Sequence, residues 1–573
     1  MLNNIRTVHR VSSAFGAALL DSAAAATVVT ALRLAPSAIG VLAPLVGGFS
    51  LAGCAADRPA SSLPIDAQVR NSSERTEDSA VPGVTPDRVK TALPELEKLT
   101  TGLLKKTGIP GLAIAVTYND QVVYAKGFGM REIDKPEAVD PDTVFQLASV
   151  SKPIGSTVIA GLVADGVVTW DDRVIDHDPG FHMHEPFVTT ALTIRDTYSH
   201  RSGLPEHAGD LLEDMEYDRT EVLRRLRFVP TKNDFRSQYA YTNFGLTEGA
   251  IAAANTAGKP WEEVSEERLY KRLGMGSTSS RLSDFLARTN RARSHVWMDG
   301  RWVAKYQRKP DVQSPAGGAS SSVNDMARWI RLHLNNGTFN GQPIVPAEAL
   351  AETYRPHMVR KPLPIQSAAE RYGFYGLGWN VDYDELGRVR LGHSGAFALG
   401  AATVVNLVPA DRLGIVVLTN AQPIGVPEAL ALSFLDLATY GKVRRDWFAF
   451  LQPIFEEMAK EGRSPIDYAK APRSSSPALP NAVYVGTYEA AFYGKLEIGV
   501  QDDTLVMHQG PKMSAYPLTH YDRDTFYYDT AGENAVGLSG VTFRIGGNGK
   551  AIGVTVENLN REGLGMFTRT MGK

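Results

Sequence analysis

The sequence predicts a large mixed α/β (α+β) domain followed by a small all-β domain. Strand-like runs lie at both ends of residues 86–440 and enclose a long helical and turn-rich middle. A Ser/Pro-rich linker at 472–480 then precedes short, regularly spaced β-prone runs. The 573-residue length is too great for one ordinary domain, and the 43% hydrophobic content is enough for large buried cores.

The elements of the first domain follow from the spacing of apolar residues. Residues 89–106 place leucines at helical spacing, and residues 112–118 and 121–126 form a predicted hairpin around a two-residue turn. Two further strands are predicted at 401–407 and 413–419. The sheet is therefore built from both ends of the domain, and the helices come from its middle.

The last domain, residues 481–573, is predicted to be a small β-barrel. A connecting helix and linker at 441–480 join it to the first domain. Turn residues separate its short strands, and no helical period interrupts them. The predicted strands are 483–487, 495–500, 504–508, 525–528, 541–545 and 551–557.

Residues 1–54 have the composition of a targeting segment rather than of a folded domain. Leu51-Ala52-Gly53-Cys54 resembles a bacterial lipobox, and Cys54 is the only cysteine of the chain. We therefore expect a signal segment, a lipid anchor on Cys54, and an exported protein of the periplasm or cell envelope. A transmembrane anchor is the alternative. Residues 55–85 are polar and predict a flexible tether.

Ser149 and Lys152 form an S-x-x-K motif where a helix is predicted to open. Residues three apart share a helix face, so the Lys152 amine can reach the Ser149 hydroxyl. The helix N-terminus adds free N–H groups and partial positive charge, which favour a developing oxyanion. The motif is consistent with a nucleophilic serine, although such a pair is more commonly a solvated serine and lysine.

Tyr241 and Asn243 form a second candidate element. A tyrosine can serve as a general base only where its phenol loses a proton near neutral pH, which a neighbouring Lys152 ammonium favours. Asn243 can bind a substrate carbonyl or amide and orient Lys152. Taken alone, Tyr241 fits a core aromatic residue with a satisfied hydroxyl.

The third element is His393-Ser394-Gly395-Ala396, at the end of a predicted strand. Gly395 can let a substrate backbone approach closely, and the Ala396 N–H can join that of Ser149 as an oxyanion hole. His393 can contact a substrate carbonyl or carboxylate. A half-exposed strand end is the alternative. Ser394 is not predicted to be the nucleophile, because the G-x-S-x-G pattern is incomplete and no helix follows it.

The order S-x-x-K, Y-x-N, H-x-G resembles the class C β-lactamase-like serine hydrolases, which include penicillin-binding proteins of low mass, D-amino-acid peptidases and family VIII carboxylesterases. Matching phrases are YSHRSGLP at 198–205, PAGG at 315–318 and YGLGW at 375–379. The resemblance covers residues 86–440. It implies a β-lactamase/transpeptidase-like fold, with an antiparallel five-stranded sheet flanked by helices. Residues 484–520 resemble the lipocalin-like β-barrel attached to many such hydrolases.

The resemblance implies hydrolysis through an acyl-enzyme on Ser149, with Tyr241 and Lys152 moving the proton and with no metal or cofactor. β-Lactamases of this family carry a lysine at the position of His393, where its charge binds the substrate carboxylate. Because histidine is mostly neutral at pH 7, we predict a carboxylesterase-like hydrolase of small-molecule or peptide substrates, with weak or no β-lactamase activity. A β-lactamase or D-alanyl/D-amino-acid peptidase remains an alternative, as does a non-catalytic penicillin- or peptidoglycan-binding sensor.

Other functional classes find little support in the sequence. The net charge is -3 and no long basic run occurs, so the sequence lacks the basic patch expected of a nucleic-acid-binding protein. No GxGxxG segment precedes a helix, and no P-loop lysine motif is present. His182 and His184 lack a third ligand pattern, so a surface loop is predicted there rather than a metal site.

Overall fold

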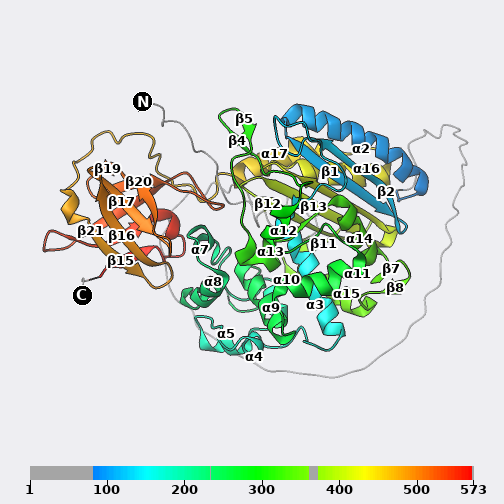
Figure 1. Cartoon of the computed structure of the whole chain (residues 1–573), viewed down its shortest axis with the longest axis horizontal. Coiled ribbons are helices and arrows are strands. Elements are labelled where there is room, and N and C mark those ends of the chain that lie inside the picture. The colour runs from blue at the N-terminus through cyan, green and yellow to red at the C-terminus, as the bar shows by residue number, and fades with distance from the viewer. Residues whose placement is uncertain (1–81, 233, 361–371, 571–573) are drawn as a thin grey trace, which may run out of the picture. The chain divides into compact units, whose positions relative to one another are not determined.

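The computed structural model describes residues 82–232, 234–360 and 372–570, and Figure 1 labels many of its elements. The predicted targeting segment with Cys54, and most of the predicted tether, lie outside the described residues. Within the described ranges, no helix combines the length and the hydrophobicity needed to cross a membrane.

The first domain is organised on an antiparallel sheet in the order β2-β1-β14-β13-β12-β11-β10-β9. Its five long strands are β2 (Gln121–Gly129), β1 (Gly111–Tyr118), β14 (Leu413–Thr419), β13 (Ala401–Val408) and β12 (Val389–Phe397). They form the five-stranded sheet that the resemblance implied.

Three short strands extend the sheet beyond β12. They are β11 (Asn380–Tyr383), β10 (Phe374–Tyr375) and β9 (Met358–Val359). The sequence did not predict them, because strands of two to four residues are too short to show a period.

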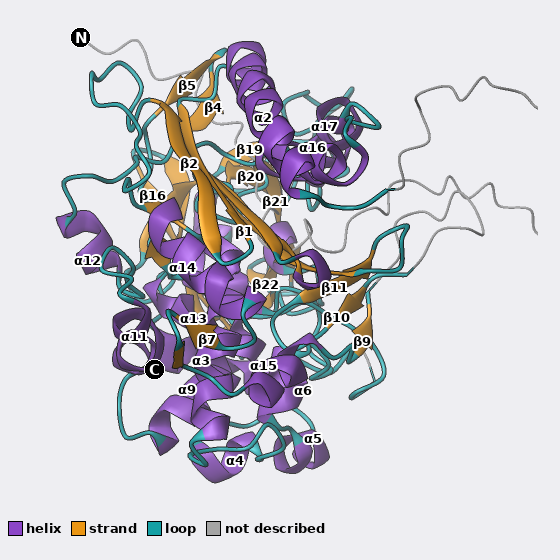
Figure 2. Ribbon diagram, turned by 90° about the vertical axis from the view of Figure 1, so that its right-hand side faces the viewer, coloured by secondary structure: helices purple, strands orange, loops and turns teal. Residues whose placement is uncertain are grey.

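The two faces of the sheet bury different residues of β1, as strand alternation requires. Leu112, Ile114 and Val116 share a core with α2 (Pro86–Thr107) and α16 (Val426–Tyr440). Ala113 and Ala115 belong to the core on the other face, where α3 (Ser151–Ala164) and α14 (Val323–Leu334) pack. Figure 2 shows α2, α16 and α17 (Trp447–Met458) together beside the strands, away from α14.

The middle of the domain supplies most of its helices, as predicted, and small two-stranded sheets connect them. Its remaining helices are α4 (Val174–His177), α5 (Pro186–Ala191), α6 (Ile194–Tyr198), α7 (Asp210–Asp214), α8 (Arg219–Arg225), α9 (Asn243–Thr256), α10 (Trp261–Ser265), α11 (Lys271–Leu273), α12 (Leu282–Ala287), α13 (Ser314–Gly317) and α15 (Ala347–Tyr354). The two-stranded sheets pair β3 (Phe145–Gln146) with β6 (Ser320–Ser321), β4 (Val296–Met298) with β5 (Arg301–Val303), and β7 (Thr338–Phe339) with β8 (Gln342–Pro343).

The C-terminal domain is one antiparallel sheet whose two edge strands are consecutive in the chain. Its order is β18-β17-β16-β15-β23-β22-β21-β20-β19, and only Leu518 separates β18 (Ser514–Pro517) from β19 (Thr519–Asp522). The sheet must therefore curl until its ends meet, which makes a nearly closed barrel. The other strands are β15 (Gly486–Ala490), β16 (Gly494–Gln501), β17 (Thr504–Gln509), β20 (Thr525–Asp529), β21 (Leu538–Ile545), β22 (Ala551–Val556) and β23 (Met566–Arg569).

The structure corrects the first predicted strand of this domain. Residues Asn481–Val483 form a 3₁₀ turn after Pro480, and the strand begins only at Gly486. Strands β18, β19 and β23 were not predicted.

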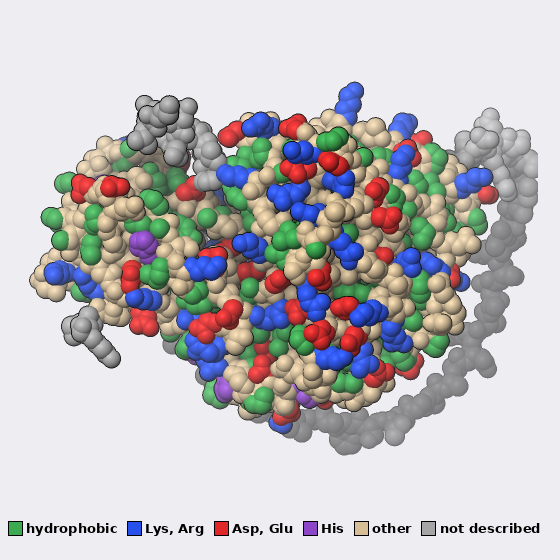
Figure 3. Space-filling model, in the orientation of Figure 1, with side chains coloured by type: hydrophobic (Ala, Val, Ile, Leu, Met, Phe, Trp, Pro, Cys, Tyr) green, Lys and Arg blue, Asp and Glu red, His purple; other side chains and the backbone are tan. Residues whose placement is uncertain are grey.

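On the face shown in Figure 3, basic and acidic side chains are interspersed rather than gathered by sign.

Candidate functional site

Ser149 lies in a single 3₁₀ turn, Ala148–Val150, immediately before α3. The sequence predicted that Ser149 would open the helix itself, but the helix begins two residues later, at Ser151. Ala148 is fully buried and has a φ of 48°. This left-handed conformation costs a residue with a Cβ about 1–2 kcal/mol, so the turn before Ser149 is strained.

The structure brings Ser149, Lys152 and Tyr241 together. The Tyr241 hydroxyl lies 2.8 Å from Ser149 Oγ, and Lys152 Nζ lies 3.1 Å from the same oxygen. Ser149 is 4% exposed, whereas Lys152 and Tyr241 are fully buried or nearly so. One hydroxyl thus has two ionisable neighbours within hydrogen-bond distance, in a site largely shielded from water.

Lys152 is surrounded by neutral oxygen atoms. Besides Ser149, its Nζ bonds Asn243 Oδ1 at 2.7 Å and the carbonyl oxygen of Ala316 at 2.9 Å. Burial holds the pKa of Lys152 well below its usual range, and the charge of Asp210 only partly opposes this. A neutral amine in this position can donate to Asn243 and Ala316 while accepting the Ser149 proton.

Asp210 and His207 stand behind Asn243, and sequence reasoning did not find either residue. Asn243 Nδ2 donates to Asp210 Oδ2 at 2.9 Å, which fixes the amide so that its oxygen faces Lys152. His207 Nδ1 lies 2.9 Å from the same carboxylate oxygen. Burial alone would lower the pKa of His207, but the hydrogen bond and the charge of Asp210 raise it overall.

His393 on β12 is held as a neutral ring. Its Nδ1 donates to the carbonyl oxygen of Ser394 at 2.7 Å, so its Nε2 accepts from the Tyr375 hydroxyl at 3.1 Å. Burial, and next the charge of Lys152, keep the pKa of His393 well below its ordinary value. No fixed positive charge is therefore supplied by this residue at neutral pH.

Gly395 is required by a contact within the protein. A Cβ at this position would lie 2.2 Å from the Leu147 carbonyl oxygen and 3.1 Å from the Ser149 nitrogen. The sequence had suggested a substrate backbone as the close neighbour, whereas the structure places the segment that carries Ser149 there. β12 and the nucleophile turn therefore pack backbone to backbone.

Ser394 and Ala396 have side chains on the other face of β12. Ala396 clusters with Phe455 of α17, and Ser394 faces Glu428 of α16, whose carboxyl pKa is raised by burial and only partly lowered by the Ser394 hydroxyl. Because strand neighbours point to opposite faces, the Ser394 hydroxyl lies away from Lys152. The backbone of Ala396 remains beside Gly395, next to the Ser149 turn.

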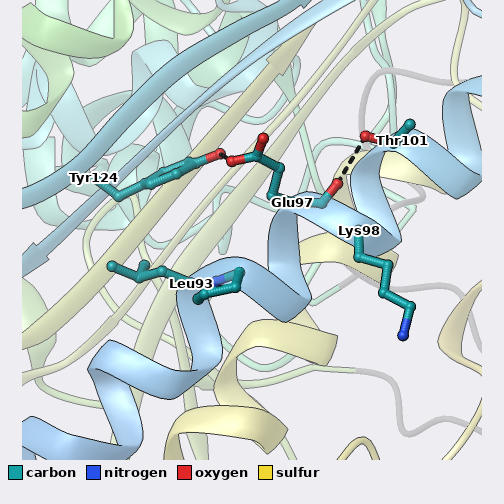
Figure 4. A pocket seen from close by; sticks show the side chains of 6 residues that line it. Leu93, Glu97, Lys98, Thr101 and Tyr124 are labelled. Carbon is teal, nitrogen blue, oxygen red and sulfur yellow. Dashed lines mark hydrogen bonds between the residues drawn. The ribbon is translucent and has the colours of Figure 1, made fainter.

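The described residues contain no candidate metal centre. Across residues 82–232, 234–360 and 372–570, no group of three or more His, Cys, Asp or Glu side chains is placed to hold a metal ion. An open hollow of about 700 Å³ lies between α2 and β2, lined by Leu93, Pro94, Glu97, Lys98, Thr101 and Tyr124 (Figure 4). These lining residues do not include Ser149, Lys152, Tyr241, Asn243 or His393.

Two family models match the chain. One is described as beta-lactamase and matches residues 96–439, and the other is described as a domain of unknown function (DUF3471) and matches residues 470–566. The first match includes the predicted site residues Ser149, Lys152, Tyr241, Asn243 and His393.

Several known proteins are similar to this chain. An unguisins hydrolase of Aspergillus violaceofuscus is 25% identical over 448 residues, which cover 73% of this chain and 78% of the relative. Penicillin-binding protein 4 of Amycolatopsis lactamdurans is 27% identical over 54% of this chain and 81% of the relative. The octameric penicillin-binding protein homologue of Pyrococcus abyssi shares the fold, with a TM-score of 0.54 and 20% identity over 81% of this chain and 98% of its own.

Proposed function

The chain belongs to the beta-lactamase family, and we propose from the geometry around Ser149 that it is a serine hydrolase acting through an acyl-enzyme. The observation that carries this proposal is the pair of bonds to Ser149 Oγ, from the Tyr241 hydroxyl at 2.8 Å and from Lys152 Nζ at 3.1 Å. A serine that served only to fill space would not need both groups.

The proposed reaction begins as Ser149 Oγ attacks the acyl carbon and its proton passes to the Tyr241–Lys152 pair. The lowered pKa of Lys152 allows the pair to take this proton near neutral pH. The backbone N–H groups of Ser149 and Ala396 stabilise the oxyanion. Tyr241 then protonates the leaving group as its bond to the acyl carbon breaks. A water gives its proton to the same pair and attacks the acyl carbon, the bond between that carbon and Ser149 Oγ breaks, and the pair returns the proton to Ser149 Oγ.

The substrate that we propose is a carboxylic ester, with β-lactam hydrolysis weak or absent. The neutral, doubly hydrogen-bonded His393 supports this choice, because it offers no fixed charge to a substrate carboxylate. An ester without a carboxylate has no need of such a charge.

The test compares initial rates on p-nitrophenyl butyrate and nitrocefin for wild type, Ser149→Ala and Ser394→Ala. We expect hydrolysis of the ester, loss of at least about 1,000-fold in Ser149→Ala, and near wild-type rates in Ser394→Ala. Full ester hydrolysis by Ser149→Ala would refute the nucleophile. Nitrocefin turnover matching that of the ester would refute the substrate class.

A second candidate is the hydrolysis of D-amino-acid peptides. Its support is the naming of relatives as penicillin-binding proteins and as a hydrolase of unguisins. Release of D-alanine from an acyl-D-Ala-D-Ala peptide, faster than ester hydrolysis at equal enzyme, would favour this candidate over the esterase.

A further inference from the structure

The β-barrel domain contacts the catalytic domain through the buried carboxyl group of Glu533. The Glu533 loop (residues 530–536) connects β20 to β21, and the Glu533 side chain accepts hydrogen bonds from the Ala398 N–H at 2.7 Å and the Leu399 N–H at 3.3 Å. Ala398 and Leu399 form the turn between β12 and β13. Glu533 of the barrel therefore supplies the acceptor for each of these two N–H groups.

The same turn supports the segment that carries the nucleophile. Phe397, the last residue of β12, is in a buried cluster with Ala148, the strained residue before Ser149. Two residues earlier, Gly395 lies against Leu147 and the Ser149 nitrogen. β12 therefore joins this turn to the backbone around Ser149 by direct packing.

A second set of bonds fixes the Glu533 loop itself. Asp214 of α7 accepts from the N–H groups of Glu533 and Asn534, both at 2.8 Å. Arg308 Nε lies 3.4 Å from Glu533 Oε2, while its guanidinium stands 4.8 Å from the centre of the Phe397 ring. The catalytic domain therefore contacts both the backbone of Glu533, through Asp214, and its side chain, through Arg308.

The loop also meets the other side of the site. Asn534 Nδ2 donates to the Asp210 carbonyl oxygen at 3.2 Å, and the Asp210 side chain orients Asn243 against Lys152. The Glu533 loop thus contacts both the turn at Ala398 and Leu399 and the start of α7. The first residue of α7, Asp210, orients Asn243 against Lys152.

We infer that Glu533 is a positioning residue for the reaction, through which the C-terminal barrel holds β12 and the Ser149 turn in their reactive arrangement. This inference rests on the proposed function. It assigns to the barrel a part in acyl transfer, and it predicts that the barrel affects turnover more than substrate binding.

The primary variant is Glu533→Ala, which removes both acceptors. We expect kcat for p-nitrophenyl butyrate to fall about 10- to 100-fold, because small displacements of reacting groups cost that much, while KM changes less than about threefold. Glu533→Gln retains one acceptor and should recover part of the loss. Glu489→Ala, an exposed carboxylate on β15, is the matched control and should behave as wild type.

A second readout does not depend on activity. Hydrogen exchange of peptides that span residues 147–152 should be faster in Glu533→Ala than in Glu489→Ala, because the Ser149 turn loses its support. If Glu533→Ala does not fold, Asp214→Asn, which weakens the anchor of the loop, should show the same changes on a smaller scale.

The inference is overturned if folded Glu533→Ala, or Asp214→Asn in its place, keeps wild-type kcat and wild-type exchange at residues 147–152, even with a lowered Tm. Failure of the proposed function gives a different pattern. In that case wild type and Ser149→Ala hydrolyse the ester equally, while the exchange measurement still decides the role of Glu533.

Discussion

Lys152 and Arg308 are both buried cations, but their surroundings are opposite. Among the described residues, Lys152 hydrogen-bonds to neutral oxygens, those of Ser149, Asn243 and Ala316. Arg308 makes a bidentate pair with Glu213, at 3.0 and 2.7 Å, and also faces Glu533. The pKa of Lys152 is accordingly lowered by burial, whereas the carboxylates around Arg308 offset its burial and raise its pKa.

The difference separates a reactive cation from a structural one. An amine that no carboxylate touches can lose its proton near neutral pH and take one from a hydroxyl. A guanidinium paired with carboxylates keeps its charge and joins the segments that carry its partners. Asp210 lies near Lys152 but reaches it only through the Asn243 amide, which leaves the amine free to change its charge.

Removing the reactive cation should have the largest effect. Lys152→Met leaves Ser149 with Tyr241 alone, so we expect kcat/KM to fall at least about 1,000-fold, equivalent to about 4 kcal/mol of transition-state stabilisation. Steady-state hydrolysis of p-nitrophenyl butyrate measures this. A fall below tenfold would mean that Tyr241 works without Lys152.

Removing the structural cation should instead affect folding. Arg308→Met leaves Glu213 and Glu533 buried without their cation, and we expect a loss of about 3–5 kcal/mol in the free energy of unfolding. Urea denaturation measures this, with Lys495→Met, from an exposed pair with Glu497, as the control expected within about 0.5 kcal/mol. Equal stability in the two variants would contradict the structural role of Arg308.

Exchanging the Asn243 amide with the Asp210 carboxylate should raise the pKa of Lys152, as carboxylates raise that of Arg308. In the double variant Asp210→Asn/Asn243→Asp, a carboxylate bonds Lys152 directly and raises its pKa. The amine then stays protonated near neutral pH, so we expect kcat/KM at pH 7 to fall about 10- to 100-fold and the acid limb of the pH–rate profile to move to higher pH. An unmoved profile would show that the charge state of Lys152 does not limit the reaction.

Glu428 is a third buried ionisable group to set beside Lys152 and Arg308. Burial shifts its pKa most, and no lysine or arginine contributes to that shift. Burial raises the pKa of Glu428 to about 7, so the folded protein binds more protons than the unfolded chain between about pH 4.5 and 7. Its contribution to stability is present below about pH 4.5 and is lost as the pH rises through 7. Glu428→Gln should therefore reduce the fall in Tm between pH 5 and 8, and an unchanged slope would contradict this.

The local elements of the chain were accessible from the sequence, because their signals lie within a few residues. β14 occupies the predicted 413–419, and the predicted hairpin turns at Asn119-Asp120, where both residues are left-handed, with φ of 48° and 65°. The S-x-x-K spacing and the Y-x-N motif likewise pointed to residues that meet in the structure.

The supporting residues were not accessible from the sequence, because their partners are distant in the chain. Asp210 is 33 residues from Asn243, and Glu533 is 135 residues from Ala398. Buried polar groups of this kind follow no period and resemble surface residues in a sequence. Only the folded arrangement shows that Asp210 orients the partner of Lys152 and that Glu533 supports the turn beside Ser149.

The central claim is that Ser149 is the nucleophile that the Lys152–Tyr241 pair activates. The most direct measurement is reaction of the full chain with a fluorophosphonate, followed by peptide mapping by mass spectrometry in wild type, Ser149→Ala and Lys152→Met. We predict a single phosphonylated peptide containing Ser149, its absence in Ser149→Ala, and labelling slowed by at least about 100-fold in Lys152→Met. Labelling at another serine such as Ser394, or equal labelling rates in wild type and Lys152→Met, would contradict the account.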